Sequence, residues 1–161
     1  MDVDKLKQLL TEVQAGQVGV DQALERLRVL PYDDMGHTRL DLHRSLRQGL
    51  PEVVFCQNKT TEQVLAILER LGQHHERVLA TRVSPEMAAA VQARLPKAHY
   101  DPTARLLTLV RTKLPPPTAD SPYMLIVTGG TSDLPVAEEA AQTAEFLGSR
   151  VERAYDVGVA G

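Results

Sequence analysis

Apolar residues follow two patterns along this chain. In some stretches they form short continuous runs, which indicate buried strands. In others they recur every three to four residues, which indicates a helix with one buried face. Between residues 53 and 111 the patterns alternate in the order strand, helix, strand, helix, turn and strand. This order predicts a small mixed α/β sheet domain.

The first 30 residues carry only the helical spacing. One helix is predicted over residues 4–15, and Asp21 is placed to cap a second helix after Gly19. Their apolar positions are Leu6, Leu9, Leu10, Val13, Val20, Leu24, Leu27 and Leu30. We expect a helical hairpin over residues 1–30 that serves packing or docking rather than catalysis.

The pattern changes at residue 31. Tyr32 to His37 is rich in turn-forming residues, which predicts a linker. The sequence Gly49-Leu50-Pro51 breaks any helix, and the apolar run from Val53 to Cys56 predicts a buried strand.

Two helices with clear start signals follow this strand. Thr60 and Gln63 have the spacing of a capping box, and Ser84 precedes a proline and an acidic residue. Residues 78–81 and 106–110 predict short strands, and Tyr100 to Arg105 resembles a turn before the last of them. We assign these elements to an N-terminal α/β domain over residues 31–113.

Three consecutive prolines within residues 114–121 predict an extended, semi-rigid linker. Beyond it, residues 122–161 contain an apolar run, a helix and a second strand, which is one βαβ unit with parallel strands and a right-handed connection. The helix has a predicted buried face made of Ala137, Ala140, Ala141, Ala144 and Leu147. Because a lone parallel pair cannot bury both of its faces, we expect the chain to be part of a longer protein.

The turn inside this unit is the strongest candidate site. The apolar run from Met124 to Val127 is followed by Thr-Gly-Gly-Thr-Ser-Asp over residues 128–133, and helical spacing begins at once. In such a strand, turn and helix, backbone N–H groups converge on an anion. Ser132 or Asp133 could cap the helix or present an oxygen to a ribose or base. The pattern predicts a phosphate or nucleotide site, at the same sheet edge as the loop from Asp156 to Gly161.

Composition and charge narrow the function classes. A net charge of -3 with mixed signs indicates neither a nucleic-acid-binding nor a membrane-binding surface. No apolar run approaches the ~20 residues of a membrane helix, and the charged N-terminus does not resemble a signal peptide. The single cysteine excludes an internal disulfide, so we expect a cytoplasmic protein.

Three further groups of side chains invite chemical interpretations. His43, Arg44 and Arg47 lie within about one helical turn and could face one anion, or could form a solvated helix face. Cys56 ends an apolar strand, which favours a small buried residue over a nucleophile. The sequence His74-His75-Glu76 favours a polar surface turn over a metal site, because adjacent histidines point apart.

Four segments together resemble one family. They are Asp41 to Phe55, Thr81-Arg82, Gly130 to Ala140 and Tyr155 to Gly161. On these segments the chain resembles the nickel-pincer nucleotide biosynthesis family, members of which have also been labelled circadian phase modifiers. The C-terminal half of that family resembles the phosphoribosylaminoimidazole carboxylase fold. The resemblance implies that residues 122–161 begin a doubly wound, Rossmann-like parallel sheet.

The resemblance also implies an activity. It implies a carboxylase and hydrolase that carboxylates the pyridinium ring of nicotinic acid adenine dinucleotide, with carbon dioxide or bicarbonate, and hydrolyses the pyrophosphate to release AMP. It implies no covalently bound cofactor and leaves open a requirement for Mg²⁺. It further implies a homo-oligomer formed through the carboxylase-like part of the longer protein.

The substrate-binding residues that follow from the resemblance lie in two loops, with two arginines added as candidates for the pyrophosphate. They are Gly129, Gly130, Thr131, Ser132, Asp133, Asp156, Gly158, Gly161, Arg44 and Arg47. The family's nucleophilic cysteine belongs beyond Gly161, so the chain by itself is expected to be inactive. Two alternatives stay open, a purine-pathway carboxylase and a non-catalytic nucleotide-binding regulatory module. The extra N-terminal domain argues against the first.

Overall fold

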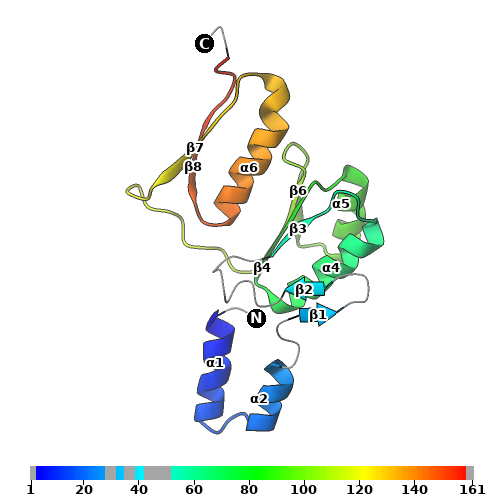
Figure 1. The fold of residues 1–161 in the computed structure, drawn as a ribbon, viewed down its shortest axis with the longest axis vertical. Coiled ribbons are helices and arrows are strands. Elements are labelled where there is room, and N and C mark those ends of the chain that lie inside the picture. The colour runs from blue at the N-terminus through cyan, green and yellow to red at the C-terminus, as the bar shows by residue number, and fades with distance from the viewer. Residues whose placement is uncertain (1–2, 28–31, 35–38, 42–51, 159–161) are drawn as a thin grey trace.

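The structure is a computed structural model that describes residues 3–27, 32–34, 39–41 and 52–158 (Figure 1). At its start, α1 (Val3–Gln14) and α2 (Val20–Leu27) form the predicted helical hairpin. Leu9, Val18 and Ala23 are buried between the two helices. Asp21 lies in the first turn of α2 rather than at its cap.

The linker predicted from Tyr32 onward is wrong in part. Tyr32–Asp34 forms β1, which pairs antiparallel with β2 (Arg39–Asp41) in a small separate sheet. Polar sequence favoured a turn here, but the backbone N–H and C=O groups of a three-residue strand can pair whatever its side chains are.

A four-stranded sheet forms the centre of the chain, with strand order β3-β4-β6-β5. The strands are β3 (Val53–Phe55), β4 (Arg77–Thr81), β5 (Ala98–Asp101) and β6 (Leu106–Val110). Only β3 and β4 run parallel. The predicted turn from Tyr100 begins too early, because Tyr100 and Asp101 pair with Leu107 and Leu106 inside β5.

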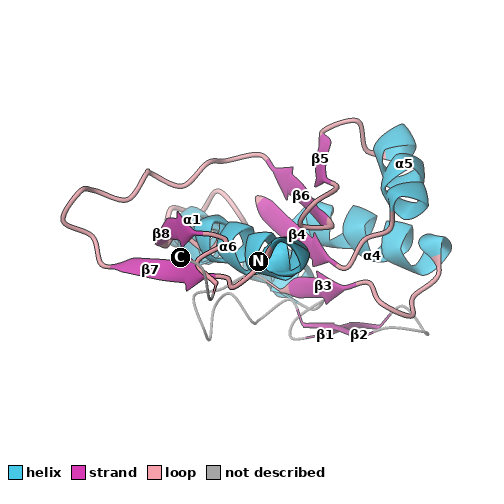
Figure 2. Ribbon diagram, turned by 90° about the horizontal axis from the view of Figure 1, so that it is seen from above, coloured by secondary structure: helices cyan, strands magenta, loops and turns pink. Residues whose placement is uncertain are grey.

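One face of this sheet is covered by α4 (Thr61–His74) and α5 (Pro85–Arg94), as Figure 2 shows. Both helices begin as predicted. Thr60 and Gln63 form the capping box, and the Ser84 hydroxyl accepts from the backbone N–H of Met87. The side chains buried between helices and sheet include Val54, Val64, Ile67, Leu68, Val78, Val91 and Leu107. This cluster is the main hydrophobic core.

The end of α4 corrects one prediction. His74 is the last residue of the helix and His75 is its C-cap, with a side chain only 5% exposed. His75 is therefore not part of a polar surface turn. The helix end packs onto the sheet domain and buries the imidazole there.

The opposite face of the same sheet packs against the C-terminal segment. That segment contains β7 (Tyr123–Val127), the 3-10 helix η1 (Thr131–Asp133), α6 (Leu134–Phe146) and β8 (Arg150–Ala154). Phe146 of α6 joins Leu79, Ala104 and Leu106 in a second hydrophobic cluster. The Arg77 guanidinium lies 4.2 Å from the centroid of the Phe146 ring and also donates to the Phe146 carbonyl oxygen.

The βαβ unit has the predicted parallel pairing, with Tyr123 opposite Arg150 and Val127 opposite Ala154. Its helix buries Ala137, Ala141 and Ala144 as predicted, whereas Ala140 is exposed. Phe146, which was not among the residues predicted to be buried, is also buried. Most of β7 is exposed although it is apolar: Tyr123, Met124, Leu125 and Val127 are each between 44% and 57% exposed. An exposed apolar strand of this kind is typical of a surface that another segment or chain covers.

No helix in the described part of the chain is long and apolar enough to cross a membrane.

Candidate functional site

The loops after β7 and β8 meet at the carboxyl edge of the parallel pair. The backbone N–H of Val157 donates to the Thr128 carbonyl oxygen at 3.0 Å, and the N–H of Asp156 donates to Thr128 Oγ1 at 3.2 Å. The Thr128 N–H in turn donates to the Ala154 carbonyl oxygen at 3.2 Å. Thr128 is only 8% exposed, so one buried threonine joins the two predicted binding loops.

Gly158 and Gly129 lie in close backbone contact within this edge. A Cβ atom built on Gly158 would lie 2.3 Å from the Gly129 carbonyl oxygen, which no real side chain tolerates. Position 158 therefore requires glycine, because the Gly129 backbone lies too close for any side chain. Asp156, two residues earlier, has a φ of 58°, a left-handed conformation that aspartate adopts more readily than most residues. Such backbone conformations concentrate at functional sites.

The Gly129–Asp133 loop closes on itself through Asp133. The Asp133 Oδ2 atom accepts from the Gly130 N–H at 3.2 Å, and the Asp133 N–H donates to the Gly130 carbonyl oxygen at 3.1 Å. The prediction that Ser132 or Asp133 caps the helix is confirmed in position, because Asp133 is the N-cap residue of α6, but not in its hydrogen bonding. A 3-10 turn precedes α6, and the Asp133 side chain makes no capping hydrogen bond to that helix. Thr131 and Ser132 are exposed at the start of this turn.

The arginine closest in sequence to these loops is held by carboxylates. Arg153 Nε lies 3.2 Å from Glu138 Oε1, and its Nη2 donates to Glu145 Oε2 at 2.9 Å. These hydrogen bonds, first those to Glu145, raise the pKa of Arg153 above its ordinary value. Tyr155 Oη also donates to Glu138 Oε1 at 2.8 Å. Arg153 thus fixes β8 to α6.

The carboxylate of Glu138, on the side of α6 next to β8, is ionised. Burial by itself raises the pKa of Glu138, but hydrogen bonds from Gln142, Tyr155 and Arg153 together bring it below its ordinary value. Burial and the neighbouring Glu138 carboxylate raise the pKa of the Tyr155 hydroxyl. The side of α6 next to β8 is therefore a network of satisfied ion pairs.

A different ion pair joins the βαβ unit to the four-stranded sheet. Arg82 Nε lies 2.8 Å from Glu139 Oε2 and 2.9 Å from Oε1. Arg82 follows β4 and has a φ of 58°. Sequence reasoning singled out Thr81-Arg82 as a motif without a role, and 57 positions of sequence separate Arg82 from Glu139.

Cys56 is buried as predicted, with 1% of its surface exposed. Its Sγ lies 3.6 Å from the Val54 carbonyl oxygen. Burial raises the pKa of the thiol to about 11, an effect that nearby Lys59 only partly offsets. A thiol in this environment is a poor nucleophile at neutral pH.

The structure therefore brings Gly129, Gly130, Thr131, Ser132 and Asp133 to the same edge as Asp156 and Gly158. Three further predicted residues, Arg44, Arg47 and Gly161, lie outside the described residues. Sequence reasoning missed the joining role of Thr128. Its signal was a polar residue directly after an apolar strand, which by itself only marks a strand end.

Comparison with known proteins identifies the family. A family model described as the LarB/PurE-like N-terminal domain matches residues 32–112. The chain belongs to this family. The match spans the segment from β1 to the end of β6 and so includes the whole four-stranded sheet. The β7–β8 edge lies beyond the matched residues, and its interpretation as a site depends on its own geometry.

An uncharacterized protein of Methanocaldococcus jannaschii is similar over almost all of the chain. It is 29% identical over 160 residues, which cover 97% of this chain and 62% of that protein. The chain thus spans less than two thirds of the length of this relative.

Proposed function

We propose that this chain is the N-terminal portion of a carboxylase that acts on a nucleotide. The observation that carries the proposal is the junction of two glycine-bearing loops at the carboxyl edge of β7 and β8, in a chain of the LarB/PurE-like family. Open parallel sheets bind their ligands at this edge. The more specific proposal is carboxylation of the pyridinium ring of nicotinic acid adenine dinucleotide with release of AMP.

The chemistry of the loop supports a nucleotide. Thr131 and Ser132 offer exposed hydroxyl groups at the start of a helical turn, where backbone N–H groups suit a phosphate. Asp133 and Asp156 offer carboxylates, which suit the hydroxyl donors of a ribose and repel a phosphate. We propose that the phosphate lies at Thr131 and Ser132 and the ribose at the two aspartates.

Positive charge for the pyrophosphate must come from elsewhere. Arg82 and Arg153 are both paired with glutamates of α6, and Arg77 lies against Phe146 at the other end of that helix. The proposal assigns the pyrophosphate to Arg44 and Arg47, as the family resemblance suggested. A bound Mg²⁺ would supply the same kind of charge, so a metal requirement is part of the test below.

The carboxylation itself requires an electron-rich ring. A thiolate that adds to the pyridinium ring supplies the electrons, the ring then takes up carbon dioxide and loses a proton, and departure of the thiolate restores the aromatic cation. Water cleaves the pyrophosphate, which yields AMP and the biscarboxylated mononucleotide. The burial of Cys56 and the raised pKa of its thiol support a nucleophile outside this chain.

The test uses the longer protein, incubated with bicarbonate and nicotinic acid adenine dinucleotide, with and without Mg²⁺. AMP and a mononucleotide that is heavier than nicotinic acid mononucleotide by one carbon dioxide are measured by liquid chromatography and mass spectrometry. Carboxylation of aminoimidazole ribonucleotide instead would favour the purine-pathway alternative. Nucleotide binding without turnover of either substrate would favour the regulatory module.

Variants assign the residues. We expect Ser132→Ala and Asp133→Asn each to weaken nucleotide binding by about tenfold, the loss of one good hydrogen bond to a charged or polar group. Asp120→Asn is the matched control, because it removes the same negative charge from an exposed residue of the proline-rich linker. Unchanged affinity in both site variants would contradict the assignment of this edge.

A further inference from the structure

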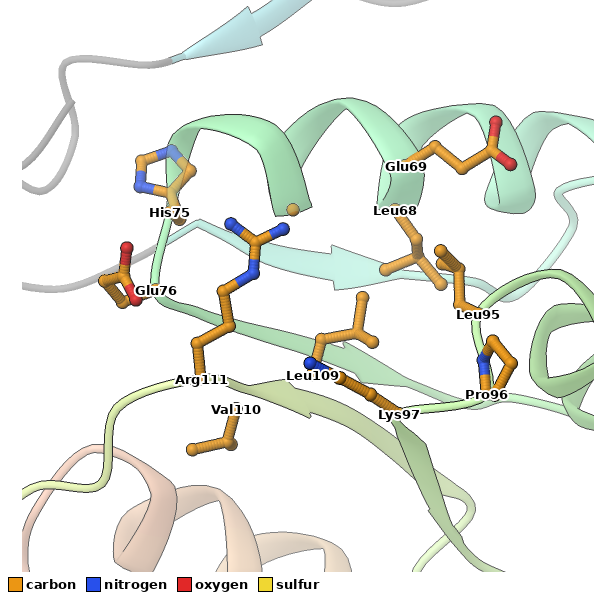
Figure 3. Close-up of a pocket in the computed structure, with 11 residues that line it drawn as sticks. Leu68, Glu69, His75, Glu76, Leu95, Pro96, Lys97, Leu109, Val110 and Arg111 are labelled. Carbon is orange, nitrogen blue, oxygen red and sulfur yellow. The ribbon is translucent and has the colours of Figure 1, made fainter.

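A separate cavity of about 250 Å³ lies in the N-terminal sheet domain, away from the β7–β8 edge (Figure 3). It is bounded by the last turns of α4, the loop after α5 and the end of β6. Leu68, Leu95 and Leu109 give it an apolar wall, and Lys97 and Arg111 are at its rim. An apolar cavity with a few polar groups at one side is the usual form of a small-molecule site.

Gly72 leaves this cavity open. It lies inside α4, where glycine costs about 0.5–1 kcal/mol relative to alanine. Its φ is not in the left-handed region, and an added Cβ would meet only Leu109 Cδ1, at an ordinary contact distance of 3.9 Å. Neither the backbone conformation nor crowding requires a glycine here. Its local effect is the space that it leaves beside Leu109.

The charges at the rim leave two cations available. Glu69 is paired with Arg94 at 3.2 Å, and Glu76 Oε2 accepts from Thr112 Oγ1 at 3.2 Å. The side chains of Lys97 and Arg111 make no hydrogen bond or ion pair with any residue that the structure describes. In Figure 3 the Arg111 guanidinium extends from the end of β6 toward α4, whereas the Glu69 carboxylate points away from the cavity.

We propose that this cavity binds a small organic acid with an aromatic or branched body. The apolar body packs against Leu68, Leu95 and Leu109, and the carboxylate pairs with Arg111 and Lys97. An apolar cavity of about 150 Å³ accommodates benzene, so the larger volume here accommodates a ring that carries a carboxylate. The guanidinium fork of Arg111 matches the two oxygens of a carboxylate. This inference does not depend on the proposed function.

Benzoate is the probe, and benzamide is its neutral counterpart of nearly equal shape. Binding to the intact chain is measured by titration calorimetry and by the rise in melting temperature that a ligand of the folded state produces. We expect benzoate to bind about tenfold more tightly than benzamide. Acetate carries the charge without the ring and is expected to bind more weakly than benzoate.

Variants separate binding from folding. Gly72→Ala is expected to raise the melting temperature in the absence of ligand but to lower benzoate affinity, and Gly72→Leu is expected to abolish binding. Arg111→Gln should lower the affinity for benzoate and leave that for benzamide unchanged. Arg105→Gln removes an exposed arginine from the other end of β6 and is the matched charge control.

Three results would overturn the proposal. They are no saturable benzoate binding by the native chain, equal affinity for benzoate and benzamide, and undiminished benzoate affinity in Gly72→Leu. The third result counts only if the Gly72→Leu protein is folded. The melting curve and circular dichroism establish whether it is. If Gly72→Leu does not fold, Gly72→Ala and Arg111→Gln decide the question.

Discussion

The backbone of Gly158 approaches that of Gly129 so closely that a Cβ on Gly158 would lie 2.3 Å from the Gly129 carbonyl oxygen. Beside this contact, the Val157 N–H donates to the Thr128 carbonyl oxygen at 3.0 Å. The end of β8 is thus held against the end of β7 by backbone atoms. Two loops that are far apart in sequence form one surface at the candidate site.

This contact makes Gly158→Ala disruptive. The added methyl group must displace one loop, so we expect a loss of about 1–3 kcal/mol in the free energy of unfolding, measured by urea denaturation. Gly130→Ala is the control for stability, because a Cβ at Gly130 has nothing within 4 Å and its φ is extended. Equal stability of the two variants would contradict the close contact.

Thr128 provides a second prediction. In Thr128→Val the shape is retained but the buried hydroxyl that accepts from the Asp156 N–H is lost. We expect about 1–2 kcal/mol of destabilisation, which in a protein of this size corresponds to a fall of roughly 2–8 °C in melting temperature. Thr131→Val is the control. It replaces an exposed hydroxyl by a methyl group in the same way and should leave the free energy of unfolding nearly unchanged.

The Arg82–Glu139 ion pair is expected to couple the βαβ unit to the four-stranded sheet. A double-mutant cycle with Arg82→Gln and Glu139→Gln should give a coupling energy of about 0.5–1 kcal/mol, since both side chains are partly exposed to solvent. The Arg94–Glu69 pair is longer, at 3.2 Å, and its side chains are 65% and 36% exposed. Its own cycle should give a smaller coupling, and the reverse order would contradict a role for Arg82 in joining the two units.

Cys56 gives a pH-dependent prediction. Burial raises the pKa of the thiol from its ordinary value of 9.0 to about 11 in the folded chain, so the unfolded thiol loses its proton first as the pH rises. The stability that this difference contributes is complete below pH 9 and is lost between about pH 9 and 11. We expect Cys56→Ala to show a shallower fall in unfolding free energy over that interval. An identical slope in the two proteins would count against burial as the cause.

The same burial predicts slow chemical modification. Iodoacetamide at pH 8 should leave native Cys56 almost unmodified and should alkylate it readily in urea, because the thiolate is the reactive form. Mass spectrometry of the intact chain measures both rates. Rapid alkylation of the native chain would show that the thiol is accessible.

Local signals in the sequence predicted much of the fold. The capping box at Thr60 and the Ser84-Pro85 start depend on side chains within three positions of each other, so they are visible without a structure. The parallel β7–β8 pair followed from an apolar run, an alanine-rich helix and a second predicted strand in direct succession. The candidate loop was visible for the same reason, because strand, glycine-rich turn and helix follow one another directly.

The prediction failed where a partner at a distance decides the structure. Tyr32–Asp34 is a strand because Arg39–Asp41 pairs with it, and Tyr100 belongs to β5 because Leu107 lies opposite. The burial of His75 depends on how the end of α4 packs onto the sheet domain. Such interactions leave no local pattern in hydrophobicity.

The amino-acid sequence by itself determined where the capped helices, the apolar strands and the glycine-rich turn lie, since those properties arise from neighbouring residues. Only the tertiary structure decided that Thr128 binds Asp156, that Gly158 lies against Gly129 and that Arg82 pairs with Glu139. Each of these contacts joins residues between 28 and 57 positions apart. Their free energy depends on distances that packing of the whole chain establishes, and for that reason they appear only after the chain has folded.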